Sequence, residues 1–167
     1  LDSTRTQTIA GTSVTTFNEL QINKGAAAQT VTLLKNMIID SSLILTQGSL
    51  LMNSKSLTMN NSSLSGGTVL APTGPFTRTN GFLISESAAA TVIWKNATTP
   101  GFRLVPFGSE AIATPIYIPF STQLSSGSFG DLSIATYKAV GNLPWPLGVT
   151  HFNPATGPGN NAAAAVD

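Results

Sequence analysis

The side chains that could carry out chemistry are few and lie far apart. The only histidine of the 167-residue chain is His151, in the segment GVTHFNP, and there is no cysteine. A catalytic hydroxyl needs a general base within hydrogen-bond reach, so His151 is the only imidazole that could serve. Its neighbours Phe152 and Pro154 favour a packed or interfacial histidine over a catalytic base.

The carboxylates do not form a recognisable site either. They occur singly, as Asp2, Glu19, Asp40, Glu86, Glu110, Asp131 and Asp167. Calcium needs several oxygen ligands close together, and glycoside hydrolysis needs a carboxylate pair. A fold could bring Glu86 and Glu110 together, but no spacing indicates it, and no glycine-rich segment opens a helix to cradle a phosphate. We therefore predict no catalytic residue, no metal site and no cofactor, and hence no enzyme.

Composition excludes two classes of partner. Charged residues make up 9% of the chain and the formal net charge is +1, where globular proteins have about 25% charged residues. No cluster of lysine or arginine offers the basic stripe that nucleic acid requires. The apolar runs are far shorter than the roughly 18 residues of a membrane-spanning helix, so we predict no membrane span. Weak charge repulsion favours association between copies.

Alternation of polar and apolar residues predicts strands. Residues 14–23 place Leu20 and Ile22 on one face, and the same period of two recurs to residue 59. Aliphatic residues also recur every sixth position, at Leu33, Ile39, Leu45, Leu51 and Leu57. This spacing predicts a β-solenoid, or β-helix-like, segment over residues 1–70. An antiparallel meander with evenly long strands, giving a single β-sandwich, is the alternative. Both interpretations make the chain all-β.

The pattern changes after the segment APTGPF, whose two prolines cannot donate to a central ladder. Longer and more aromatic runs follow, which predict a β-sandwich-like segment over residues 71–141. Residues 142–167 are rich in proline, glycine and alanine and have little surface to bury. We expect this extended C-terminal tail to be ordered by contact with a neighbouring molecule.

A few aromatic residues are candidates for contacts with partners. Trp145 lies between two prolines, which favours an exposed or interfacial position, whereas Trp94 follows an apolar run and is expected in the core. The predicted interface or ligand anchors are Trp145, His151, Phe152 and Tyr117. Arg78 and Arg103 are predicted to be strand or rim charges.

Two stretches carry a resemblance to a known group of proteins. TQTIAGTSVTTFNELQINKG, residues 6–25, is similar to recurring segments of large secreted cell-surface proteins from Bacteroidota. The later phrases TRT (77–79), LVPFG (104–108) and PIYI (115–118) resemble a second pattern of the same proteins, although Val-Pro-Phe-Gly stands where they have Pro-Val-Gly. The resemblance implies β-helix-like rungs, export through a type IX pathway, and a role in adhesion or structure. It implies no catalytic residue.

Together these features predict a non-enzymatic extracellular structural protein at the cell surface. We expect it to be a self-associating subunit of a fibre or layer, with copies joined head to tail by strand or tail insertion. The alternative is an adhesin or carbohydrate-binding module that recognises surface glycans.

Overall fold

The structure is a computed structural model that describes residues 2–3, 5–26, 28–60, 76–95, 101–109, 117–127 and 130–136. Trp145, His151, Phe152 and the predicted tail of residues 142–167 lie outside these ranges. The described residues form thirteen strands and no helix, so the predicted all-β class is confirmed. The strands are β1 (Asp2–Ser3), β2 (Gln7–Ile9), β3 (Thr15–Lys24), β4 (Thr30–Leu33), β5 (Met37–Gln47), β6 (Ser49–Leu51), β7 (Leu57–Met59), β8 (Phe76–Arg78), β9 (Phe82–Ile84), β10 (Val92–Trp94), β11 (Gly101–Val105), β12 (Phe120–Leu124) and β13 (Leu132–Ile134).

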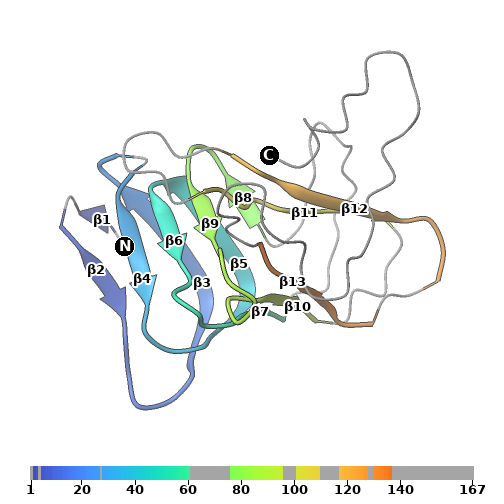
Figure 1. Cartoon of the computed structure of the whole chain (residues 1–167), viewed down its shortest axis with the longest axis horizontal. Helices are drawn as coiled ribbons and strands as arrows, with labels where there is room; N and C mark the ends of the chain where they lie inside the picture. The colour runs from blue at the N-terminus through green and yellow to red at the C-terminus, as the bar shows by residue number, and fades with distance from the viewer. Residues whose placement is uncertain are drawn as a thin grey trace. The chain divides into compact units, whose positions relative to one another are not determined.

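Two sheets contain most of these strands. The first has the order β1-β3-β5-β7-β10-β13, with β8 also paired to β5, and the second has the order β2-β4-β6-β9. Every pair in the two sheets is parallel except β10–β13. Figure 1 shows β2, β4, β6 and β9 side by side in chain order. The strands from β4 to β7 alternate between the sheets, so the chain crosses from one sheet to the other at each step.

The pairing register decides which side chains stack. Val31 lies opposite Leu50, and Leu50 lies opposite Leu83. In the first sheet, Met37 lies opposite Leu57, which in turn lies opposite Val92. We call one passage of the chain through the second sheet and then the first a circuit, as in β4 followed by β5. Stacked side chains therefore come from successive circuits of the chain.

The spacing of six that the sequence displays has a different meaning. Leu33, Ile39 and Leu45 are all fully buried, but they follow one another along β4 and β5 and are not paired with each other. Leu51 breaks the series because it is only half-buried, whereas its neighbour Leu50 is fully buried. A spacing of six thus marks successive stretches of one circuit.

Strict alternation explains the core. In β4 and β7, every second residue is buried and the residues between are half-buried, as the pleat of a strand requires. The buried residues of both sheets form one hydrophobic cluster, into which Trp94 is fully buried as expected. Threonine, serine and asparagine take many of the outward positions, so the chain needs few charges to cover this core.

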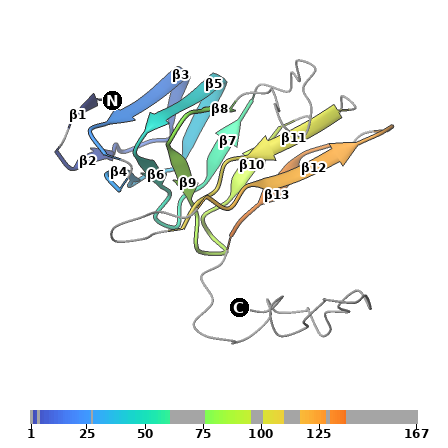
Figure 2. The same ribbon diagram turned by 90° about the horizontal axis from the view of Figure 1, so that it is seen from above.

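The parallel order ends at the C-terminal side of the stack. β13 pairs antiparallel with β10 and is the last strand of the first sheet. Beyond β9, Leu83 bridges to Phe107 in parallel, and Gly108 then bridges to Tyr117 in antiparallel fashion. β11 and β12 form a separate antiparallel pair, which Figure 2 shows beside β10 and β13.

The predicted boundary near residue 71 falls within residues 61–75, outside the described ranges. Strands from both sides of it pair directly, since β8 lies against β5 and β9 against β6. The described residues all belong to one compact unit, Leu1–Tyr137. The division of the chain at residue 71 stays a prediction.

Candidate functional site

The first circuit of the stack has an edge without a strand partner among the described residues. β2 pairs only with β4, and residues 15–22 of β3 pair only with β5, since β1 covers just Asn23 and Lys24. We call β2 and residues 15–22 the N-terminal edge. Such an edge presents unpaired N–H and C=O groups to any strand that approaches.

The direction of these groups follows from one hydrogen bond. The N–H of Thr15 donates to the carbonyl oxygen of Asn36, at 3.4 Å, and therefore points toward the next circuit. In a parallel ladder, the N–H and C=O of one residue face one neighbour and those of the next residue face the other. The N–H and C=O of Thr16 therefore face outward at the N-terminal edge.

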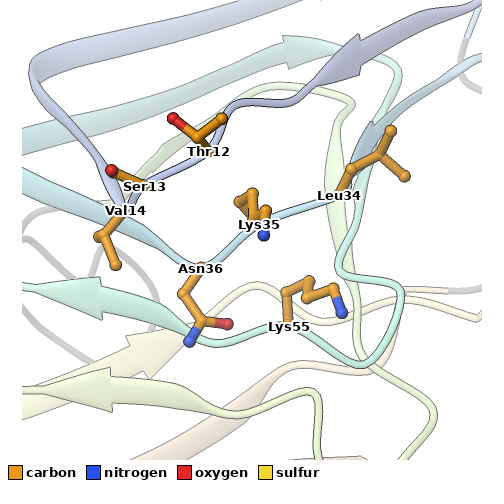
Figure 3. A pocket seen from close by; sticks show the side chains of 7 residues that line it. All are labelled: Thr12, Ser13, Val14, Leu34, Lys35, Asn36 and Lys55. Carbon is orange, nitrogen blue, oxygen red and sulfur yellow. The ribbon is translucent and has the colours of Figure 1, made fainter.

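A second candidate site lies where the chain turns from the second sheet back to the first. A cavity of about 410 Å³ opens there to the surface, and Figure 3 shows the side chains that line it. We call it the lysine groove; it is lined by Thr12, Ser13, Val14, Leu34, Lys35, Asn36 and Lys55. Three successive turns supply these residues, so the groove crosses from one circuit to the next.

Two hydrogen bonds hold Asn36 at the centre of the lysine groove. Its side-chain oxygen Oδ1 accepts from the N–H of Ser56 at 3.1 Å, and its main-chain oxygen accepts from Thr15. Because Oδ1 is engaged, the amide nitrogen Nδ2 is the end of the side chain that remains to donate. The groove therefore gathers one amide donor, two hydroxyls and two ammonium groups.

Tyr117 is the predicted anchor that the structure describes, and it is partly exposed, at 37%. Its ring centroid lies 3.8 Å from the guanidinium carbon of Arg78, which is also 4.8 Å from the ring of Phe82. These are cation–π distances. Arg78, predicted as a strand or rim charge, lies on strand β8 and contacts the rings of both Tyr117 and Phe82.

Arg103, also predicted to be a strand or rim charge, lies on strand β11 and not at the rim, since only 1% of its surface is exposed. Its guanidinium carbon lies 5.8 Å from the ring centroid of Trp94, and burial lowers the pKa of the Arg103 guanidinium below its usual value. Val105, two residues further along β11, is buried as well. That shared strand face was the signal in the sequence, and the chemical type of the side chain concealed it.

Within the described ranges no three histidine, cysteine, aspartate or glutamate side chains group together as metal ligands would. The carboxylate of Glu19 accepts a hydrogen bond from the hydroxyl of Ser42, and that of Asp40 accepts one from the amide of Asn60, both at 2.7 Å.

Glu86 and Glu110 are the pair of carboxylates that a fold could bring together for catalysis. Glu110 lies outside the described residues. The main-chain N–H of Glu86 donates to the hydroxyl of Thr136, and Glu86 has a positive φ of 51°. Nothing in the described part of the chain therefore tests whether these two carboxylates meet.

In the part of the chain that the structure describes, no helix has the length and apolarity needed to cross a bilayer. No protein-family model, curated protein or solved structure matches the sequence or the fold. The resemblance to surface proteins of Bacteroidota therefore stays a prediction, and function has to be argued from the two sites above.

Proposed function

We propose that this protein is a non-enzymatic structural protein of the cell surface or extracellular space, built as a short β-solenoid. Copies of it associate through the N-terminal edge. The observation that carries this proposal is that, within the described ranges, no strand pairs with the outer side of β2 or of residues 15–22 of β3.

The parallel order of β1 to β10 supports the solenoid. A β-sandwich consists of antiparallel sheets joined by hairpins and Greek-key connections. Here the strands from β1 to β7 enter alternate sheets, and strands of successive circuits pair in parallel, which is the arrangement of a coiled chain. The antiparallel strands β11–β13 are the part that most resembles the sandwich expected for residues 71–141.

The two ends of the stack differ, and this difference limits how copies can join. At the C-terminal side, antiparallel β13 covers β10, and Tyr117 bridges to the segment beyond β9. At the N-terminal side, no strand of the described residues covers β2 or residues 15–22. The edge that remains at the C-terminal side is the three-residue β13, whereas the N-terminal edge offers residues 15–22 of β3, so sheet continuation is favoured between two N-terminal edges.

A contact between two like edges is isologous and closes on itself, which yields a pair of molecules related by a two-fold axis. The strands of the partner then run antiparallel to β2 and β3, a pairing that is at least as favourable as a parallel one. A fibre or layer would add a second contact elsewhere on the surface. We propose the pair as the unit from which any larger assembly is built.

The N-terminal edge has few of the features that block edge pairing. Glu19 is its only charged residue, and the carboxylate of Glu19 is drawn toward β5 by the hydroxyl of Ser42. Edges that resist pairing usually carry lysine, proline or inward-pointing charges. The low charge of this edge supports association.

The experiment is sedimentation of the full chain at micromolar concentration, comparing Thr16→Pro with Thr16→Val. Proline removes the outward N–H of Thr16 without removing a bond to β5, whereas valine keeps the N–H and the strand propensity. We expect a dimer for the native chain and for Thr16→Val, and a monomer for Thr16→Pro. A monomeric native chain, or a Thr16→Pro variant that still dimerises, would contradict the proposal.

A second candidate function is an adhesin or glycan-binding module, and one observation favours it. Ile118 and Phe120 are 51% and 39% exposed and follow the partly exposed Tyr117, so an apolar strip lies near the C-terminal side of the stack. Binding of surface glycans that is lost in Phe120→Ser would support this function. Failure of a glycan array to retain the protein would remove it.

A further inference from the structure

We propose that the lysine groove binds an acidic saccharide, with a carboxylate or sulfate group of the sugar held between the ammonium groups of Lys35 and Lys55. The inference rests on four observations: the register of the two lysines, the charge balance around them, the donors beside them, and the apolar rim.

Register brings the two lysines together. β5 and β7 pair with Met37 opposite Leu57, and the same register continued two residues back sets Lys35 opposite Lys55. The bond from the N–H of Ser56 to Asn36 shows that the two turns stay in contact at this point. Neighbouring strands lie about 4.8 Å apart, so two cations share one short stretch of surface, as Figure 3 shows.

Among the described residues, no carboxylate that lines the groove compensates this pair of charges. Three of the acidic side chains in the described ranges are engaged elsewhere, by Ser42, Asn60 and Lys95. Like charges directly opposite one another in a sheet are unfavourable. An anion between Lys35 and Lys55 would turn this repulsion into two attractive contacts.

The other cations of the described part of the chain are occupied. Lys24 is buried and bonded to oxygen acceptors, Lys95 forms an ion pair with Asp131, and Arg78 lies against two aromatic rings. Arg5 has an interaction partner as well. Arg103 is buried against Trp94. Lys35 and Lys55 therefore form an isolated charge pair and not part of a long basic stripe, which disfavours nucleic acid.

The remaining lining fits a sugar better than a peptide. Thr12 and Ser13 supply hydroxyls that donate or accept, and Asn36 supplies an amide donor, so the groove can meet several ring hydroxyls besides one acid group. A peptide would instead use main-chain groups along a free sheet edge. Val14 and Leu34, 52% and 43% exposed, give an apolar rim for the C–H face of a ring. The cavity volume lies within the range of small-ligand sites.

The experiment is a titration of the full chain with a galacturonic acid trisaccharide, followed by calorimetry and by amide chemical shifts. A sulfated galactose trisaccharide and inorganic sulfate are titrated separately to distinguish the source of the anion. We expect binding of at least one acidic trisaccharide, with shifts at residues 12–14, 34–36 and 55. Affinity should fall as salt is raised, because the contacts are exposed charges.

Two variants test whether binding depends on Lys35 and Lys55. The double variant Lys35→Gln, Lys55→Gln removes both charges with little change of length, and we expect at least a tenfold loss of affinity. Lys95→Gln is the matched control, because it removes a lysine from another face, and we expect its affinity to stay native. Thermal unfolding of each variant verifies that it folds.

Three results would overturn the inference. The first is equal binding of the fully methyl-esterified trisaccharide, which has no charge. The second is unchanged affinity in the double variant, and the third is binding of a triglutamate peptide as tight as that of either saccharide. The titration is repeated on Thr16→Pro, so that loss of association and loss of saccharide binding are read separately.

Discussion

The ammonium group of Lys24 donates hydrogen bonds to the main-chain oxygen of Arg5, at 2.6 Å, and to the side-chain oxygen of Gln7, at 2.9 Å. Lys24 ends β3 and is only 2% exposed, whereas Arg5 lies in the connection between β1 and β2 and Gln7 begins β2. A buried cation is stable only where acceptors replace its water. This lysine therefore joins the end of β3 to the start of β2 within the first circuit and keeps the N-terminal edge in place.

Replacing Lys24 with methionine tests this role. Methionine keeps the apolar stem but leaves two acceptors without their donor, at a cost of about 1–3 kcal/mol. Because the loss is local, we expect faster hydrogen exchange at residues 5–9 while β5 and β7 stay protected. Lys35→Met is the control, since Lys35 is exposed, and its exchange should match the native chain. Equal protection of β2 in Lys24→Met would contradict the role of this contact.

The direction in which neighbouring leucines point provides a second test. Leu50 is fully buried and stacks between Val31 and Leu83, whereas Leu51 is only half-buried. Leu50→Ala should cost about 2–5 kcal/mol of unfolding free energy, because it leaves a cavity in the stack. Leu51→Ala should cost clearly less. Denaturant titration of both variants measures the difference, and a larger loss for Leu51→Ala would mean that the register is wrong.

This pair also shows how far the sequence could be read. Period-two alternation predicted strands, and it also indicated buried positions such as Leu33 and Leu45, because the pleat of a strand is a local property. The spacing of six assigned Leu51 to the core and missed Leu50. A chain that turns a corner every few residues resets its alternation, and a fixed period cannot follow that.

The lysine groove could not be predicted from the sequence for a related reason. Lys35 and Lys55 are unremarkable along the chain, and they come together at one groove only because β5 pairs with β7 just beyond them. Contacts between residues far apart in sequence decide which strands pair. Local sequence patterns do not reveal these contacts. The same holds for the N-terminal edge, which is defined by the strands that do not cover it among the described residues.

Two glycines with nearly the same backbone conformation provide a third prediction. Gly48 has φ +80° and Gly127 has φ +82°, so alanine is strained at both, by about 1 kcal/mol. A Cβ on Gly48 would also lie 2.5 Å from Cβ of Lys24 and 2.9 Å from the main-chain oxygen of Gln29, while nothing lies within 4 Å at Gly127. We expect Gly48→Ala to lower the melting temperature several degrees further than Gly127→Ala.

The carbonyl of Gln29 cannot move away easily, because it accepts a 2.8 Å hydrogen bond from the N–H of Ser49. The extra loss in Gly48→Ala therefore measures the close approach between two circuits of the stack. Equal melting temperatures for the two variants would show that the circuits separate without cost at this turn.

The last prediction concerns β13 as the cover of the final edge. β13 pairs antiparallel with β10, and its Leu132 and Ile134 pack partly buried against the core, while Ser133 faces solvent. The ion pair between Lys95 and Asp131 is about half exposed and adds at most about 1 kcal/mol. The two apolar contacts should therefore hold the strand in place.

Replacing both Leu132 and Ile134 with asparagine should release β13 and free the outer edge of Val92–Trp94. The freed edge and the N-terminal edge then lie at opposite sides of the stack, so one molecule can pair in parallel with the next, and such contacts do not close. We expect the variant to sediment as species larger than a dimer, whereas Ser133→Asn should sediment as the native chain does. The prediction is contradicted if the double variant keeps the native size while hydrogen exchange shows that β10 has lost protection. In that case β13 does not limit assembly, and the difference between the two ends of the stack does not affect association.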